Sequence, residues 1–121
     1  MAKTFFRLLI VAVLVTMTPA SAATLSEDQA INRLITIVQR DRLYTAWTKL
    51  ECLTFTTEAT SAQYFDIAIR EKHEGKCLGD PGVSPIVDRF RVFRHAKKIL
   101  WFRPNDGEFV SYSQVKVWRR K

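Results

Sequence analysis

Polar and apolar residues alternate with a helical period in the stretch that begins at Ser26. Apolar residues recur there at three- and four-residue spacing with polar residues between them, which is typical of an amphipathic helix. Ser26 and Gln29 have the spacing of a capping box, and the two acids between them favour the positive end of a helix. The pattern predicts a helix from Glu27 to about Leu43. Its apolar positions are Ile31, Leu34, Ile35 and Val38.

The period of the apolar positions changes to two after Cys52. Such alternation predicts half-buried strands separated by turns. The expected strands cover residues 53–58, 64–70, 87–94 and 99–102. Residues 44–50 are ambiguous, and one interpretation is a short broken turn of helix with Trp47 packed under the sheet. Residues 109–118 are expected to add a last strand or an ordered tail.

One helix followed by about four antiparallel strands defines the α+β class. We expect the helix to pack on a curled antiparallel sheet, as in a cystatin-like or small nuclear-transport-factor-like roll; a single convincing helix favours the smaller, cystatin-like form. The chain has 121 residues and no internal repeats, so residues 23–121 are expected to form one domain. The expected core residues are Ile31, Leu34, Ile35, Val38, Leu53, Phe55, Phe65, Ile67, Ile69, Phe90, Val92, Leu100 and Phe102.

Residues 1–22 have the three parts of a cleavable signal peptide. Lys3 and Arg7 give a positive start, an apolar run covers residues 8–15, and Ala20-Ser21-Ala22 fits the small-residue cleavage pattern. The apolar run is too short for a membrane anchor, which needs about 20 residues. The sequence therefore predicts export to the periplasm or the medium, without a membrane span after cleavage.

The two cysteines, Cys52 and Cys77, are expected to form a disulfide, because thiols in a small exported domain usually pair. Closing the loop between them removes about 3.5 kcal/mol of unfolded-state entropy in the chain model. A redox role is disfavoured because the cysteines are far apart in the sequence, unlike a Cys-x-x-Cys pair.

The basic residues are concentrated in the second half of the chain. The formal net charge is +7, but residues 24–80 carry more acids than bases, whereas bases outnumber acids strongly from residue 81 onward. Such a surface attracts anionic partners, and export argues for an acidic protein or an anionic envelope component rather than nucleic acid. The alternative interpretation is a solvated basic edge that prevents association.

Two regions are candidates for recognition. The first is a surface of basic and aromatic residues, because arginine and tryptophan are enriched at protein interfaces. Its members are Arg89, Arg91, Phe93, Lys97, Lys98, Trp101 and Arg103. The second is a proline- and glycine-rich loop, which a disulfide at Cys77 stiffens and which loses little entropy on docking. Its central residues are Gly79, Asp80, Pro81 and Gly82. The alternative interpretation of the basic surface is a solvated face of the sheet, and that of the loop is a long connection that only needs to be fastened.

No catalytic residue, metal site or cofactor is predicted. His73 and His95 lie in predicted turns, without a nucleophile motif nearby. His73, Glu74 and Cys77 resemble a partial ligand set, but the expected disulfide uses Cys77. An enzyme that uses His73 with Glu74 or Asp80 remains an unfavoured alternative.

The middle of the chain resembles a family of small, functionally uncharacterised exported proteins of Gram-negative bacteria. The resemblance covers Cys52 to about Phe102. The motifs that carry it are Cys77-x-Gly79-Asp80-Pro81, then Pro85, then Asp88-Arg89-Phe90-Arg91-Val92. It implies the periplasm and a common fold, and it supplies no catalytic residue.

These patterns support a periplasmic or secreted binding or inhibitor-type protein, with an immunity-like role as one form of it, that recognises a protein or an anionic envelope component. One alternative is a small-ligand carrier with a pocket between helix and sheet, beside Phe65, Phe90 and Trp47. The identity of the partner and the oligomeric state are not predicted.

Overall fold

The computed structural model describes residues 10–17 and 24–121. Residues 10–17 form neither helix nor strand. Within the described residues, no helix is long and apolar enough to span a bilayer. The positive start of the predicted signal peptide and its cleavage pattern at residues 20–22 lie outside the described residues.

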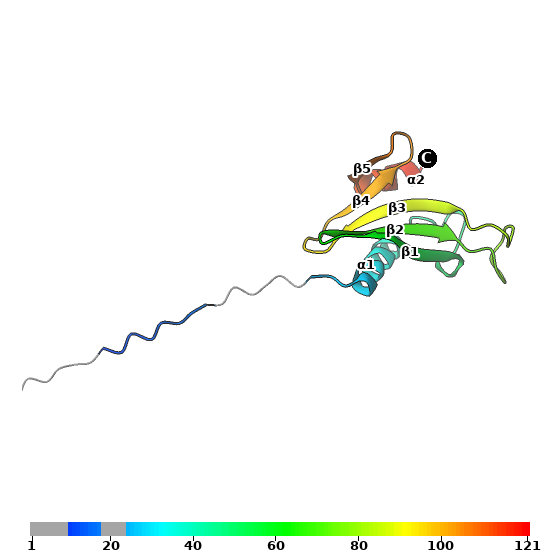
Figure 1. Cartoon of the computed structure of the whole chain (residues 1–121). Helices are drawn as coiled ribbons and strands as arrows, with labels where there is room; N and C mark the ends of the chain where they lie inside the picture. Colours follow the sequence, from blue (N-terminus) through cyan, green and yellow to red (C-terminus); the bar gives the residue numbers. More distant parts are fainter. Residues whose placement is uncertain (1–9, 18–23) are drawn as a thin grey trace, which may run out of the picture.

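The fold is α+β, as predicted, with a helix before an antiparallel sheet (Figure 1). The elements are α1 (Glu27–Arg40), the 3-10 helix η1 (Leu50–Cys52), β1 (Leu53–Thr60), β2 (Tyr64–Glu71), β3 (Ile86–Phe93), β4 (Ile99–Arg103), β5 (Glu108–Ser111) and α2 (Ser113–Arg119). The sheet has five strands in the order β1-β2-β3-β4-β5, one more than expected. β5 is the last strand expected within residues 109–118, and the rest of that stretch forms the helix α2 rather than more strand or a tail.

Helix α1 begins as the sequence predicts and ends earlier. The hydroxyl of Ser26 accepts from the Gln29 amide at 3.2 Å, and the Gln29 side chain accepts from the Ser26 amide at 2.9 Å. After Arg40 the chain turns through Arg42, whose φ of 49° lies in the left-handed region. The turn buries Tyr44 and leaves Trp47 46% exposed, so the interpretation that Trp47 packs under the sheet is wrong.

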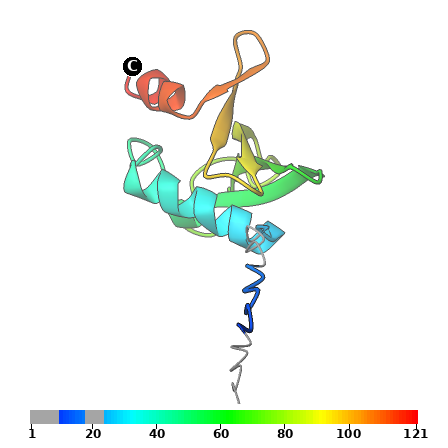
Figure 2. The same cartoon turned by 90° about the vertical axis from the view of Figure 1, so that its left-hand side faces the viewer.

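Both helices contribute to one core on the inner face of a curled sheet. Helix α1 contacts β2 and β3, whereas α2 contacts β4 and β5. Figure 2 shows β4 rising steeply away from the β1–β2 part of the sheet, with α1 and α2 on the same side. The core holds Leu34, Val38, Leu53, Phe65, Ile67, Ile69, Phe90 and Val92, all of them predicted.

The prediction for β4 has the wrong phase. Leu100 and Phe102, expected in the core, are only half-buried, while Trp101, expected on the surface, is 1% exposed. The register explains the correction, because Trp101 lies directly opposite the buried Phe90. Neighbours across two strands point to the same face. Ile31, Ile35 and Phe55 are also half-buried rather than fully enclosed.

Asp88 is the one buried charged residue among those described, and it joins four parts of the chain. It accepts from the Tyr44 hydroxyl at 2.7 Å and from Trp101 Nε1 at 2.9 Å. Arg119 donates to it from α2 at 3.0 Å. Burial, followed by the nearby Asp88 carboxylate, raises the pKa of Tyr44, so this phenol stays protonated. The cluster holds α2 against the sheet.

Candidate functional site

The predicted disulfide between Cys52 and Cys77 is confirmed, and it fastens the long β2–β3 connection to the end of η1. The two Cα atoms are 5.4 Å apart. The other end of the connection is held to β2, because the Ser84 hydroxyl donates to the Glu71 carbonyl at 2.7 Å. Glu71 in turn donates its amide to the Pro85 carbonyl at 2.9 Å. The connection is therefore anchored at both ends.

His73 anchors the middle of this connection. Its Nδ1 lies 2.9 Å from the Asp80 carbonyl oxygen and its Nε2 lies 2.8 Å from Glu71 Oε2. Both partners are acceptors, which favours the doubly protonated ring. The Glu71 carboxylate, followed by the Asp80 carbonyl, raises the pKa of His73. A ring that donates from both nitrogens has no lone pair with which to act as a base.

The histidine partners differ from those that the sequence suggested. His73 contacts Glu71 rather than Glu74, and it contacts only the main chain of Asp80. The Asp80 carboxylate instead accepts from the Gly82 amide at 2.8 Å. Among the described residues, no group of three or more potential ligands is arranged to hold a metal ion.

The predicted recognition loop is exposed and closely held. Gly79 has a φ of 124°, and a Cβ atom there would lie 2.6 Å from the His73 ring, so glycine is required. Val83 donates its amide to the Asp80 carbonyl at 3.1 Å, which closes a turn over residues 80–83. Leu78, just before this turn, is 94% exposed. A leucine in a turn-rich loop gives no signal of its own in the sequence, so the exposure of Leu78 follows only from the structure.

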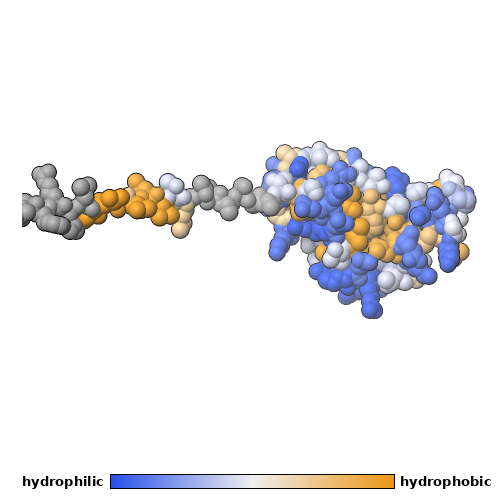
Figure 3. Space-filling model, turned by 90° about the horizontal axis from the view of Figure 1, so that it is seen from below, coloured by the Kyte–Doolittle hydropathy of each residue, from blue (hydrophilic) through white to orange (hydrophobic). Residues whose placement is uncertain are grey.

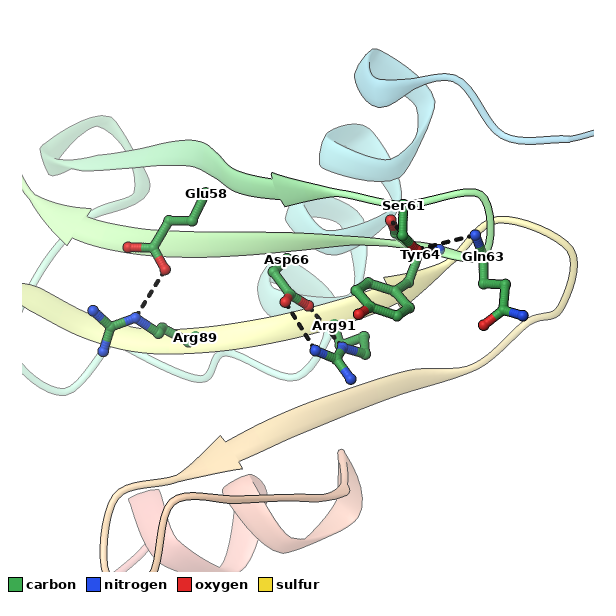
Figure 4. Close-up of polar contacts among 7 residues, drawn as sticks. All are labelled: Glu58, Ser61, Gln63, Tyr64, Asp66, Arg89 and Arg91. Atoms are coloured by element: carbon green, nitrogen blue, oxygen red, sulfur yellow. Dashed lines mark hydrogen bonds and ion pairs between the residues drawn. The ribbon is translucent and has the colours of Figure 1, made fainter.

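Arg89 and Arg91 of the predicted basic surface lie on the outer face of the sheet, where carboxylates pair with them (Figure 4). Arg89 Nε on β3 donates to Glu58 of β1 at 2.9 Å, over the intervening strand β2. Arg91 makes two parallel bonds to Asp66, at 2.8 and 2.9 Å. These partners come from β1 and β2, so the local sequence of β3 does not show them.

Aromatic rings complete the environment of Arg91. Its guanidinium carbon lies 3.8 Å from the centroid of the Tyr64 ring and 4.0 Å from that of Phe109. Phe93 lies edge-on to Tyr64, with 6.0 Å between ring centroids. The Asp66 carboxylate raises the pKa of Arg91 further above its usual value. Arg91 is thus a packed, neutralised part of the outer face rather than an available cation.

The remaining members of the predicted surface separate in space. Arg103 pairs with Asp106 in the following turn and donates to Gln114 of α2 at 3.1 Å. Lys97 and Lys98 lie in the exposed β3–β4 turn, and neither forms a salt bridge among the described residues. Lys98 Nζ lies 5.0 Å from the centroid of the Phe93 ring.

The two turn lysines border an open groove of about 840 Å³ between α1 and the strands β4 and β5, which we call the α1–β4 groove. Four basic residues line it, and no aspartate or glutamate is among its described lining residues. The basic residues are Arg33, Arg40, Lys97 and Lys98. Its apolar and aromatic lining residues are Leu25, Ile37, Ile99, Leu100 and Tyr112. Seen from the α1 side, the folded part shows hydrophobic surface framed by hydrophilic areas (Figure 3).

Two of the four groove cations were not in the predicted surface. Arg33 donates to the Ala96 carbonyl at 3.3 Å, which places it against the β3–β4 turn. Arg40 pairs with Asp41 at 3.1 Å, which raises the pKa of Arg40 and lowers that of Asp41. The sequence indicated only that Arg33 lies on the polar side of the helix. Its place beside Lys97 follows from the tertiary fold.

A second pocket of about 450 Å³ lies beside the disulfide and is lined by Trp47, Glu71 and His73, among others. Acidic and basic residues are mixed there, since Glu51, Lys49, Lys72 and Lys76 also contribute. Of the three residues expected beside a helix–sheet pocket, Phe65 and Phe90 are enclosed in the core, at 3% and 0% exposed, whereas Trp47 lines this second pocket.

Comparisons of the chain with protein-family models, curated proteins and solved structures gave no match. The resemblance to the exported family therefore stays a prediction. The α1–β4 groove is the best candidate for a functional site because three of its four cations, Arg33, Lys97 and Lys98, form no salt bridge among the described residues and none of its described lining residues is acidic.

Proposed function

We propose that this protein is an exported, periplasmic or secreted binding protein that recognises an anionic component of the cell envelope in the α1–β4 groove. The observation that carries the proposal is the set of basic side chains around a groove without an acidic lining residue. The signal-like N-terminus supports export, and the disulfide is of the kind that persists in an oxidising compartment.

The contrast with the outer face supports a role for the groove cations. Arg89 and Arg91 gain little attraction for a partner because Glu58 and Asp66 already cancel their charge. Arg33 and Lys97 have no such carboxylate among the described residues, and they lie beside a partly apolar surface, which screens charges less than water does. Cations of one sign that converge on a cleft focus the electric field and raise the local concentration of anions.

The proposal is tested with vesicles of phosphatidylglycerol and phosphatidylcholine, against vesicles of phosphatidylcholine alone, in a flotation assay at low and moderate salt. The mature protein, without the expected signal peptide, should bind only the anionic vesicles, and this binding should weaken as the salt concentration increases. The double variant Arg33→Glu with Lys97→Glu is expected to lose this binding.

The matched control is Lys49→Glu with Lys76→Glu, which changes the net charge equally at two exposed lysines outside the groove. Binding by this control and not by the groove variant supports a local site. Equal loss in both variants means that only overall charge matters, and absence of binding by the parent protein contradicts the proposal.

Protein recognition by the disulfide-anchored loop is a second candidate function, favoured by Leu78 at 94% exposure on a restrained turn. A preordered loop loses little entropy when it docks. Pull-downs from periplasmic extract would compare the parent protein with Leu78→Asp and with Val117→Asp, a control on α2 that is 60% exposed. A partner that is lost only with Leu78→Asp supports this function, and recovery of no specific partner contradicts it.

A further inference from the structure

We infer that the α1–β4 groove holds a single-chain amphiphile, an alkyl chain with an anionic phosphate or carboxylate head. This inference rests on the proposed function and specifies the ligand of the same groove. It is carried by the joint presence of uncompensated cations and an apolar floor in one groove, and by the order in which they occur along α1.

The floor of the groove is apolar and is supported from beneath. Leu25, Ile37 and Ile99 are half-buried and pack against the hydrophobic core, while their remaining surface lines the groove. Tyr112 adds an aromatic ring that is 9% exposed. An inorganic anion would leave this surface in water, whereas an alkyl chain would cover it, and the free-energy gain grows with the apolar area buried.

The cations are arranged unequally along the groove. Arg33 lies near the middle of the residues that line the groove from the α1 side, with Leu25 and Gln29 before it and Ile37 and Arg40 after it. Its guanidinium donates to the carbonyl of Ala96, the residue before Lys97. One helical turn after Arg33, Ile37 lines the floor, and two turns after it Arg40 is already paired with Asp41. The unpaired Arg33 and Lys97 are therefore the site for an anionic head, and the chain extends along Ile37 toward Tyr112.

The strand that lines the groove favours an alkyl chain over a peptide. The edge strand β5 contributes only Ser111 to the groove lining. β4, the main strand of the groove, is an interior strand, hydrogen-bonded to β3 on one side and to β5 on the other. Its main-chain groups are consequently not available for pairing with an added strand, which is how extended peptides gain affinity at sheet edges. A chain without polar backbone groups leaves no donor or acceptor unsatisfied against this floor. The groove volume of about 840 Å³ lies within the usual range for small-molecule sites.

The test separates the head from the tail with three soluble probes, each kept below its micellar concentration and titrated into the mature protein by calorimetry. Dodecyl phosphate has both parts, inorganic phosphate has only the head, and dodecyl maltoside has the tail with a neutral head. We expect dodecyl phosphate to bind at least about tenfold more tightly than either of the others, because the floor and the cations act on one molecule.

Two groove variants locate the binding. Ile37→Ser is expected to weaken dodecyl phosphate and to leave binding of inorganic phosphate unchanged. Arg33→Gln is expected to weaken both phosphate probes and to leave the maltoside unchanged. Thermal melts establish that each variant is folded. Arg33→Gln removes only an exposed hydrogen bond to the Ala96 carbonyl, so it keeps the test valid if Ile37→Ser unfolds.

Each outcome decides a separate statement. Equal binding of dodecyl phosphate and inorganic phosphate overturns the amphiphile and leaves the anionic proposal in place. Equal binding of dodecyl phosphate and dodecyl maltoside overturns the anionic head, and with it the proposed function. Tighter binding of a dodecapeptide of alternating glutamate and leucine overturns the alkyl chain in favour of a protein segment. Binding of anionic vesicles without binding of dodecyl phosphate refutes only the inference made here.

Discussion

The two faces of the sheet use basic residues in opposite ways. On the outer face, Arg89 and Arg91 are held by Glu58 and Asp66 from neighbouring strands, and aromatic rings cover Arg91. On the inner side, Arg33 and Lys97 both line a partly apolar groove, and neither has a carboxylate partner among the described residues. Both sets contribute to the same positive net charge, but only the second is available to a ligand.

The difference shows that ion pairing across strands determines which charges act at the surface. Neighbours on one face of a sheet come from segments far apart in the sequence, so a basic strand can be neutral in the folded protein. Helix α1 and the β3–β4 turn have no acidic strand opposite their basic residues.

The largest effect is expected at Asp88, the buried carboxylate beneath the inner face. Asp88→Ala leaves Arg119 without its partner and removes the acceptor of Tyr44 and Trp101, so we expect a loss of about 3–5 kcal/mol in the free energy of unfolding. Asp66→Ala, at the partly buried outer pair, is expected to cost about 1–2 kcal/mol. Urea unfolding measures both, and equal losses would contradict the assignment of Asp88 as the central polar contact.

Removal of the disulfide is expected to destabilise the chain without affecting the groove. Cys52→Ser with Cys77→Ser opens the loop between two cysteines that are 25 residues apart. In the chain-entropy model this lowers the free energy of unfolding by about 3.5 kcal/mol. The groove is built from α1, β4 and β5, none of which carries a cysteine. Calorimetry at a temperature where the variant is folded should therefore give unchanged binding of dodecyl phosphate, and a lost site would show that the two regions are coupled.

Single truncations distinguish the paired from the available cations. Arg91→Ala removes two hydrogen bonds to Asp66 and the contacts with Tyr64 and Phe109, so a loss of about 1–2 kcal/mol is expected. Lys97→Ala removes an exposed side chain and is expected to change stability by less than about 0.5 kcal/mol. Thermal unfolding of the two variants side by side measures the difference, and the reverse order would refute the contrast between the faces.

The smallest effect is expected from pH at His73. Its pKa is raised above the ordinary value of 6.5, so its stabilising contribution is complete below about pH 6.5 and is lost as the pH rises through the folded-state pKa. The unfolding midpoint should decrease more between about pH 6 and about pH 9 in the parent protein than in His73→Asn. NMR titration of the ring gives the pKa directly, and a value at or below the ordinary one would contradict the two-acceptor geometry.

Local patterns in the sequence were sufficient for α1, for the strands β1 to β4 and for most of the core. The capping box at Ser26 and the alternation over residues 64–70 depend on neighbouring residues, and both predictions are confirmed. The predicted inward-facing positions of β4 were wrong because all of its residues from Ile99 to Phe102 are apolar, so alternation does not show which side chains face the core. The short β5 and α2 depend on the packing of Val115 and Arg119 against distant residues.

The candidate site was only partly predictable for the same reason. The disulfide followed from composition and is confirmed, and Lys97 and Lys98 were recognised as exposed cations. The pairing of Arg91 with Asp66 and the approach of Arg33 to the β3–β4 turn are tertiary contacts between residues far apart in the chain. No local pattern encodes them.

The most direct test of the groove as the ligand site is an NMR titration of the isotope-labelled mature protein with dodecyl phosphate below its micellar concentration. The amide signals of Gln29, Arg33, Ile37 and Ile99 should shift progressively, while those of Arg89 and Arg91 on the outer face stay in place. Shifts confined to the outer face, or no shifts at all, would contradict the assignment.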